Sequence, residues 1–224
     1  GAGERIGLVG RHGAGKTTLT TTLAGETQPT AGKITRGNDI GYLPQDPRTG
    51  DLEVIALDRV LSARNLDRIV RQMRETEGAM ASADAETHEA AMERYPKLEA
   101  RFLAAGGYAA ESEAHRITSN LGLDDRVLGQ PLSTLSGGQR RRIELARILF
   151  SGVETLLLDE PTNHLDADSI VWLRDYLKSY SGGFVVISHD VELLRASVNT
   201  VFHLVASRGQ LDQYSLGWDA SRPQ

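Results

Sequence analysis

Gly10-Arg11-His12-Gly13-Ala14-Gly15-Lys16-Thr17-Thr18 is the stretch of this sequence that decides the fold. It matches the pattern G-x-x-x-x-G-K-[ST], a loop whose glycines let the backbone wrap closely around phosphate groups. The apolar run 6–9 before the loop predicts a buried strand, and residues 17–24 after it predict a helix that Gly25 ends. The positive end of this helix adds to the attraction of the loop for an anion.

The polar side chains of the loop have separate expected tasks. Lys16 supplies positive charge to the β- and γ-phosphates, and the Thr17 hydroxyl can bind Mg²⁺. The alternative is a glycine-rich turn that contains a lysine by chance, and the predicted flanking strand and helix argue against it. The residues expected to bind the nucleotide phosphates are Gly10, Gly13, Ala14, Gly15, Lys16, Thr17 and Thr18.

Two carboxylates follow a second apolar run, residues 155–158. This run predicts a buried strand, and ligands of open parallel sheets bind at the carboxyl ends of the strands. Asp159 is expected to hold Mg²⁺, and Glu160 to act on the attacking water as a general base. A polar strand end that only caps the next turn is the alternative, and the phosphate loop makes that alternative weaker.

Length, composition and charge exclude several classes of protein. The chain has 224 residues, no cysteine and a net charge of −5. A disulfide scaffold and thiolate metal sites are therefore excluded, and the acidic balance argues against general nucleic-acid coating. The apolar runs are too short to span a bilayer, and we expect a cytoplasmic protein without a signal peptide or a membrane segment of its own.

The chain divides into three zones by residue pattern. In residues 1–45, brief strands are expected at 33–35 and 40–43 around a turn at Gly37-Asn38. Residues 46–134 are rich in Ala, Glu and Arg and predict a helical subdomain. Its expected helices are 54–80, 85–105 and 109–121, and Gly106-Gly107 and Gly122 are expected to break them.

The third zone returns to alternating strands and helices. A strand is expected at 184–187 and closing strands at 201–204 and 210–214, with a helix at 167–180 that Asp166 caps. Such alternation predicts an α/β fold, a P-loop NTPase core with a mainly parallel sheet plus an inserted helical subdomain. The expected domains are a core of 1–45 and 135–214, a helical subdomain of 46–134, and a tail or linker of 215–224.

Three further motifs stand at the ends of predicted elements. Leu135-Ser136-Gly137-Gly138-Gln139 precedes an expected helix at 140–150, which Ser136 can cap. Gln45 follows the strand 40–43, and His189 follows the strand 184–187. A single glutamine or histidine is more often a surface or core residue, so it is the order of the motifs that carries the signal.

Together these motifs resemble the nucleotide-binding domain of the ATP-binding cassette (ABC) superfamily. The resemblance implies that residues 135–139 are the cassette signature, Gln45 the Q-loop glutamine, His189 the switch histidine and Asp166 the D-loop aspartate. It also implies ATP and Mg²⁺ as ligands, with Thr17, Gln45 and Asp159 at the metal and Glu160, His189 and Gln45 in catalysis. Two cassettes pair head to tail in such domains, and the signature then contacts the ATP of the partner cassette.

The string Leu158 to Asp166, with Asn163-His164 inside it, resembles the ABC-F branch of this superfamily. So do the segment Tyr42 to Gln45, the long span between Gln45 and Leu135, which lie 90 positions apart, and the segment Ala105 to Tyr108. This branch has no membrane part and acts on ribosomes in translation or antibiotic resistance. We therefore expect the first of two cassettes, with a second cassette and the ribosome as partners. The alternatives are the nucleotide-binding domain of a drug or macrolide exporter, and a DNA-repair or structural ATPase.

The family has an aromatic residue upstream of the phosphate loop that stacks on adenine, and no such residue precedes Gly10 in this sequence. His12 replaces the usual Asn or Ser of the loop, and we expect little effect. Arg64, Arg68 and Arg71 share one helix face, with Arg74 nearby, and either bind RNA phosphates or form a solvated face paired with nearby acids. The histidines lack metal-ligand spacing, so we expect no metal apart from the Mg²⁺ of the nucleotide.

Overall fold

The computed structural model describes residues 3–37, 39–46, 50–207 and 209–215. The chain forms two compact units: Gly1–Arg48 together with Gly152–Gln224, and Thr49–Ser151. Residues 135–150 were predicted to belong to the nucleotide-binding core, but they lie in the second unit, where most of them form α7 (Gly137–Phe150). The reason is that α7 packs on α2 (Ala56–Leu61) and α5 (Gly107–Asn120) of that unit.

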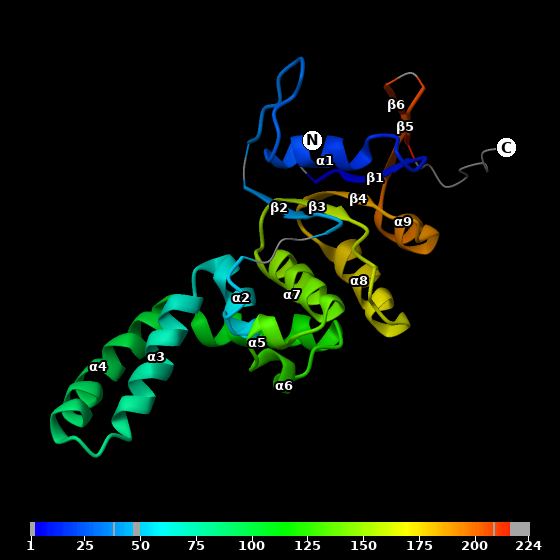
Figure 1. The fold of residues 1–224 in the computed structure, drawn as a ribbon. Coiled ribbons are helices and arrows are strands. Elements are labelled where there is room, and N and C mark those ends of the chain that lie inside the picture. Colours follow the sequence, from blue (N-terminus) through cyan, green and yellow to red (C-terminus); the bar gives the residue numbers. More distant parts are fainter. Residues whose placement is uncertain (1–2, 38, 47–49, 208, 216–224) are drawn as a thin grey trace. The chain divides into compact units, whose positions relative to one another are not determined.

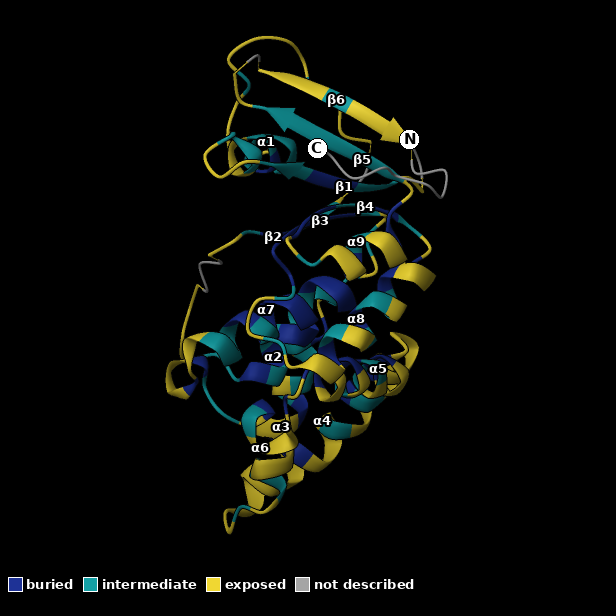
Figure 2. Ribbon diagram, turned by 90° about the vertical axis from the view of Figure 1, so that its right-hand side faces the viewer, coloured by how far each residue is buried: buried dark blue, intermediate teal, exposed yellow. Residues whose placement is uncertain are grey.

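The first unit is built on a sheet of six strands within the described residues, in the order β2-β3-β4-β1-β5-β6. Five strands run parallel, and β6 pairs antiparallel with β5. Strands β3 and β4 are mostly buried along their length, as their apolar sequences require (Figure 2). The strands are β1 (Arg5–Gly10), β2 (Ile40–Leu43), β3 (Thr155–Asp159), β4 (Gly183–Ile187), β5 (Thr200–Val205) and β6 (Gln210–Ser215). The predicted α/β class with a mainly parallel sheet is confirmed.

Among its described residues the same unit also has the helices α1 (Lys16–Ala24), α8 (Ala167–Ser179) and α9 (Val191–Ser197), labelled in Figure 1. Gly25 ends α1 in the left-handed region with φ 90°, as predicted. The side chain of Asp166 accepts a hydrogen bond of 2.8 Å from the N–H of Ser169, so the predicted cap of α8 is confirmed. The sequence analysis did not anticipate α9.

The second unit is helical within the described residues. Besides α2, α5 and α7 it contains α3 (Asp67–Met80), α4 (Ala85–Ala104), α6 (Asp125–Leu128) and the 3-10 turns Ser62–Arg64 and Leu132–Thr134. Helices α3 and α4 form a long hairpin whose faces meet at Met73, Leu98 and Phe102 (Figure 1). The predicted helices 85–105 and 109–121 are confirmed within a few residues, although Gly107 begins α5 instead of breaking it.

Two local predictions are wrong. The single helix expected at 54–80 is broken into α2, a 3-10 turn and α3, because Asn65 adopts a left-handed backbone with φ 58° that no α-helix continues. Residues 33–35 form no strand. In this segment Arg36 instead donates to the carbonyls of Leu23 and Thr22 at the end of α1. Two predictions cannot be compared with the structure. Asn38 of the predicted turn Gly37-Asn38 and residues 216–224 of the predicted tail lie outside the described residues.

Buried ion pairs join the helices of the second unit. Glu144 on α7 is 5% exposed and accepts two hydrogen bonds from the Arg59 guanidinium on α2, of 2.7 and 3.2 Å. Asp58 is 4% exposed. Its two carboxylate oxygens accept hydrogen bonds of 3.1 and 3.2 Å from the Arg74 guanidinium. The hydrogen bond to Asp58 is the main reason why the pKa of Arg74 is raised. Arg74 therefore serves the packing of α2 against α3.

The part of the chain described here contains no helix that combines the length and the apolar run needed to cross a bilayer.

The Arg59–Glu144 pair generates a prediction about stability. Arg59→Ala leaves a buried carboxylate without its main partner, which typically costs about 3–5 kcal/mol. We expect the lower end of this range, because Arg147 lies 3.8 Å from the same carboxylate. Urea unfolding measures the loss. The matched control is Lys97→Ala, whose partner Glu93 is exposed, and this variant should unfold at the same urea concentration as the parent chain. Equal losses in the two variants would contradict the structural role of Arg59.

Candidate nucleotide-binding site

The phosphate loop lies between β1 and α1. At Gly10, the last residue of β1, the neighbouring strand β5 is too close to leave room for a side chain. A Cβ on Gly10 would lie 2.8 Å from the carbonyl oxygen of Leu204 on β5. Gly13 and Gly15 have positive φ values of 77° and 98°, which glycine adopts without strain. The glycines therefore allow the left-handed turns by which the loop leads into α1.

The Lys16 side chain folds back over this loop. Its Nζ donates hydrogen bonds of 2.8 Å to the carbonyl of Gly10 and 3.0 Å to the carbonyl of Arg11. These contacts place the ammonium group above the loop, where it borders the same cavity as Thr17 and Thr18. A cation in this position is suited to bind phosphate oxygens.

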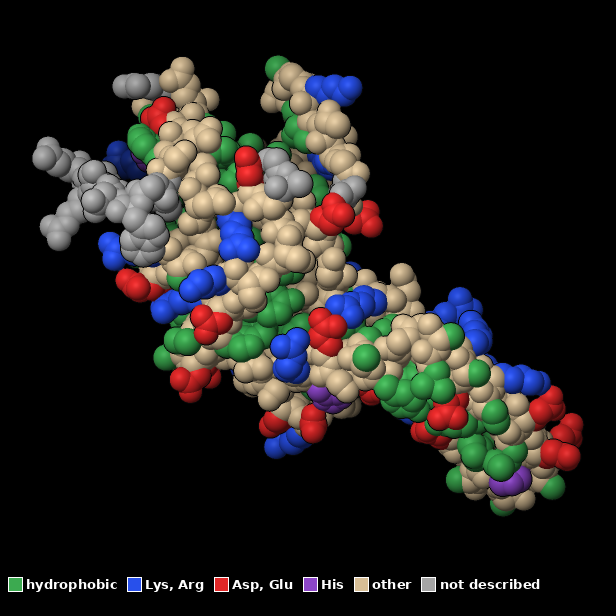
Figure 3. Space-filling view, turned by 180° about the vertical axis from the view of Figure 1, so that it is seen from behind, with side chains coloured by type: hydrophobic (Ala, Val, Ile, Leu, Met, Phe, Trp, Pro, Cys, Tyr) green, Lys and Arg blue, Asp and Glu red, His purple; other side chains and the backbone are tan. Residues whose placement is uncertain are grey.

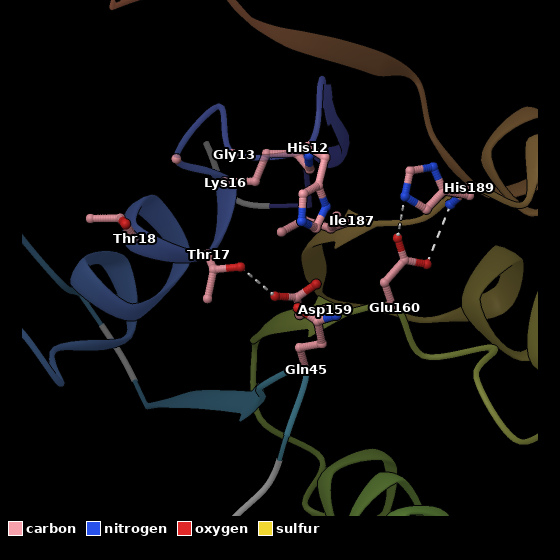
Figure 4. Close-up of a pocket in the computed structure, with 11 residues that line it drawn as sticks. His12, Gly13, Lys16, Thr17, Thr18, Gln45, Asp159, Glu160, Ile187 and His189 are labelled. Atoms are coloured by element: carbon pink, nitrogen blue, oxygen red, sulfur yellow. Dashed lines mark hydrogen bonds and ion pairs between the residues drawn. The ribbon is translucent and has the colours of Figure 1, made fainter. Parts of the chain in front are cut away.

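Thr17 and Asp159 meet across the site. The Thr17 hydroxyl at the start of α1 donates to Oδ2 of Asp159 at the end of β3 over 3.3 Å (Figure 4). Asp159 is 2% exposed, and Gln45 from the end of β2 borders the same cavity. Hydroxyl, carboxylate and amide oxygens are ligands that Mg²⁺ accepts, so this donor set fits the ion. Among the described residues no group of three His, Asp or Glu could hold a metal alone, and Mg²⁺ usually shares its ligands with phosphates.

Glu160 and His189 form a second contact, at the ends of β3 and β4. The backbone N–H of His189 donates to Oε2 of Glu160 over 3.4 Å, and the imidazole Nε2 lies 3.2 Å from Oε1 (Figure 4). Glu160 has a left-handed backbone with φ 49°, a strained conformation for a residue with a side chain, and its N–H donates to the carbonyl of Ile187 at 2.8 Å. Such strain is held where the surrounding structure fixes it and is typical of functional sites.

These side chains surround one cavity of about 300 Å³. Nine residues that the sequence predicted for the site line it, and they follow four different strand ends: Gly13, Gly15, Lys16, Thr17, Thr18, Gln45, Asp159, Glu160 and His189. Gly10 and Ala14 belong to the loop but do not line this cavity. His12 and Ile187 do line it, although the sequence analysis gave them no role. The position of His12 inside the loop motif was the available signal.

The remaining motifs lie elsewhere. Ser136 caps α7 by accepting a hydrogen bond from the N–H of Gln139, and the Gln139 side chain accepts one from the N–H of Ser136. This capping box confirms the predicted cap and fixes Gly137 and Gly138 in the first turn. Leu135 is 5% exposed and belongs to the helical unit. Asp166 caps α8 in the first unit. The contribution of residues 135–139 and Asp166 to a nucleotide site stays a prediction.

Tyr42 on β2 precedes the strand end that carries Gln45. Burial is the main cause of the raised pKa of Tyr42, and the negative charges of Glu26 and Asp159 raise it further. The Tyr42 phenol therefore stays neutral at physiological pH.

Comparison with known proteins identifies a family and several relatives. Residues 1–163 match the model of the ABC transporter family. The chain is 36% identical to the putative ATP-binding protein YdiF of Bacillus subtilis over 97% of this chain and 34% of that protein. It is 38% identical to the tylosin resistance ATP-binding protein TlrC of Streptomyces fradiae, over 90% of this chain and 37% of TlrC. It is 36% identical to the energy-dependent translational throttle protein EttA of Haemophilus influenzae, over 84% of this chain and 34% of EttA.

The chain thus spans about a third of the length of these curated relatives. Two solved structures show the same fold. An ATP-binding subunit of an ABC transporter has a TM-score of 0.68 at 18% identity, over 96% of this chain and 80% of its own. MJ0796, a bacterial ABC transporter cassette solved as a dimer, has a TM-score of 0.66 at 20% identity, over 96% of this chain and 87% of its own.

The position of Lys16 predicts a loss of nucleotide binding in Lys16→Ala. One charge-assisted hydrogen bond to a phosphate is worth about 1.5–3 kcal/mol, so ATP affinity should fall by about 10- to 150-fold. Calorimetric titration with ATP and Mg²⁺ measures the change. Lys33→Ala removes an exposed lysine outside the cavity and should bind ATP like the parent chain. Unchanged affinity in Lys16→Ala would remove this residue from the site.

Proposed function

The chain belongs to the ABC transporter family, and we propose that it is the ATP-hydrolysing cassette of an ABC-F type protein that acts on the ribosome. Cassettes of this family are ATPases, and nucleotide binding follows from the family. The observation that carries the proposal is the convergence of Lys16, Asp159, Glu160 and His189 on one cavity at the ends of parallel strands.

Four side chains of the cavity have a proposed task in hydrolysis: Lys16, Gln45, Glu160 and His189. Lys16 and the N–H groups of the loop bind the β- and γ-phosphates. Glu160 accepts a proton from water as the water oxygen bonds to the γ-phosphorus and the bond to the ADP oxygen breaks. His189 contacts the Glu160 carboxylate from the neighbouring strand end, so it can orient this base and approach the γ-phosphate. Gln45 borders the cavity beside Asp159 and is proposed to sense the metal and the water.

Mg²⁺ would be held by Thr17, Asp159 and Gln45, and it would neutralise negative charge on the phosphates. The Thr17 hydroxyl and the Asp159 carboxylate already lie 3.3 Å apart, so both can turn towards one ion.

A second cassette is the proposed partner in hydrolysis. Pairing of cassettes is general for this family. We propose that residues Leu135, Ser136, Gly137, Gly138 and Gln139 contact ATP held by the partner cassette, and that Asp166 lies near the joint of the pair. The capping box at Ser136 supports this, because it leaves the first N–H groups of α7 ordered as anion donors. An isolated cassette is then expected to bind ATP but to hydrolyse it slowly.

The ribosomal assignment is supported by the relatives. Their names describe translational throttling for EttA and tylosin resistance for TlrC. The string Asn163-His164, where His164 has a left-handed backbone with φ 67°, lies in the segment on which the ABC-F resemblance rests. A cytoplasmic location accords with this proposal. A cassette that serves a membrane transporter is the second candidate, since it shares the family and the fold.

The proposed base predicts the behaviour of Glu160→Gln. The amide cannot accept the proton from water, so turnover should fall by about 10²–10⁴-fold while ATP affinity stays close to that of the parent chain. Single-turnover hydrolysis and calorimetric ATP binding separate the two effects. Glu26→Gln, an exposed glutamate near the end of α1, is the matched control and should hydrolyse normally. Hydrolysis by Glu160→Gln at the parent rate would show that another group is the base.

The ribosomal role is tested with the complete protein that contains this chain. The Glu160→Gln substitution should hold paired cassettes closed on ATP, so this variant should co-sediment with ribosomes in ATP and be released in ADP. If the ATP-bound variant instead pellets with membranes and ribosomes stay free of it, the transporter assignment replaces the ribosomal one.

A further inference from the structure

The segment that carries His189 is held from two sides. On the cavity side, Glu160 accepts a hydrogen bond of 3.4 Å from the backbone N–H of His189, and its Oε1 lies 3.2 Å from the imidazole Nε2 (Figure 4). On the other side, the N–H of Asp190 donates to the Ser188 hydroxyl over 3.0 Å. Oδ1 of Asp190 accepts a hydrogen bond of 2.9 Å from the N–H of Leu193 and so caps α9. The place of the imidazole therefore depends on what holds Asp190 as well as on Glu160.

Arg174 on α8 approaches the same aspartate. Its Nη2 lies 3.8 Å from Oδ2 of Asp190, the carboxylate oxygen that does not cap α9, and the two side chains are 28% and 20% exposed. Helices α8 and α9 pack against each other (Figure 1). Leu173 and Leu177, on the same helix as Arg174, are fully buried, so α8 is a firmly packed element. Arg174 thus links a fixed helix to the residue that follows His189.

A link that serves only the packing of α8 on α9 is the alternative. Nε of Arg174 is buried and has no hydrogen-bond partner in the described part of the chain. A buried donor without a partner costs free energy, so the contact is not optimised for stability. Local arrangements kept at such a cost are typical of functional positions. The two roles differ in what they predict: packing alone predicts lost stability, and positioning predicts lost hydrolysis in a chain that stays folded.

We propose that Arg174 positions His189 for ATP hydrolysis. The guanidinium attracts the Asp190 carboxylate, and Asp190 fixes the turn from which the preceding residue presents its imidazole to Glu160. Arg174 does not line the nucleotide cavity, so it acts through Asp190 and is a positioning residue. Misplacing a catalytic group by about 1 Å can cost about 100-fold in rate, so a contact of this kind has a measurable effect. The inference rests on the proposed role of His189.

Single-turnover hydrolysis by the chain, together with calorimetric ATP binding, tests the role of Arg174. Arg174→Ala should lower the rate of hydrolysis by about 10- to 100-fold and leave ATP affinity close to that of the parent chain. Arg174→Lys keeps a positive charge and should recover part of the rate. Asp190→Asn keeps a side chain that can cap α9 but loses the charge that attracts Arg174, so its rate should match that of Arg174→Ala.

The matched control is an arginine of an exposed ion pair on α9. Arg195 lies 3.7 Å from Glu192, and their side chains are 67% and 65% exposed. Charged side chains of both signs are scattered over the face seen in Figure 3, and an exposed pair of this kind contributes little. Arg195→Ala removes the same type of side chain and should hydrolyse ATP at the parent rate.

A double-mutant cycle separates positioning from stability. If Arg174 acts through His189, adding Arg174→Ala to His189→Ala should change the rate by less than about twofold, because the group that Arg174 positions is already gone. A loss of equal size in both backgrounds would overturn the proposal, as would a parent rate in Arg174→Ala. Should Arg174→Ala fail to fold by circular dichroism, Asp190→Asn takes its place in the cycle with the same expected result.

NMR of the chain distinguishes failure of this inference from failure of the proposed function. The ring signal of His189, identified by its loss in His189→Ala, should shift in Arg174→Ala and stay in place in Arg195→Ala. An unchanged signal in Arg174→Ala, with slow hydrolysis by His189→Ala, would overturn only the inference. Hydrolysis by His189→Ala at the parent rate would overturn the proposed role of His189 and the inference with it.

Discussion

The parallel pairing of β1, β3 and β4 is the constraint on which the site depends. Strands that run in one direction end at one edge of the sheet, and polar residues that follow them then meet. Here β4 pairs with both β1 and β3, so the phosphate loop after β1, the two carboxylates at the end of β3 and His189 after β4 border a single cavity. Residues more than 140 positions apart in the sequence, such as Thr17 and Asp159, form a hydrogen bond for this reason alone.

The helical unit follows a different principle. Its long helices are amphipathic, and apolar contacts such as Met73, Leu98 and Phe102 hold the hairpin together. Buried ion pairs then fix how the helices are joined: Arg59 with Glu144 connects α2 to α7, and Asp58 with Arg74 connects α2 to α3. Because buried pairs are costly to break and add little over apolar packing, their main effect is to select one arrangement of helices.

Much of the core and the site could be predicted because the signals are local. Glycine spacing defined the loop, apolar runs defined β1, β3 and β4, and Asp166 and Ser136 marked helix starts. The wrong predictions of secondary structure fall where contacts between distant residues determine the backbone conformation. Asn65 breaks a helix that periodicity alone would continue, and residues 33–35 have strand-forming side chains but no strand partner among the described residues. The contact between Glu160 and His189 and the ion pair between Arg64 and Glu113 join residues far apart in the sequence, which no local pattern predicts.

We propose that Thr17 and Asp159 form a metal-dependent phosphate site with the loop. Calorimetric titration of ATP into the chain and into Asp159→Asn, each with and without Mg²⁺, tests this most directly. We predict that Mg²⁺ tightens ATP binding to the parent chain and that the tightening is lost in Asp159→Asn, while binding without Mg²⁺ is retained. Full tightening by Mg²⁺ in Asp159→Asn would contradict it.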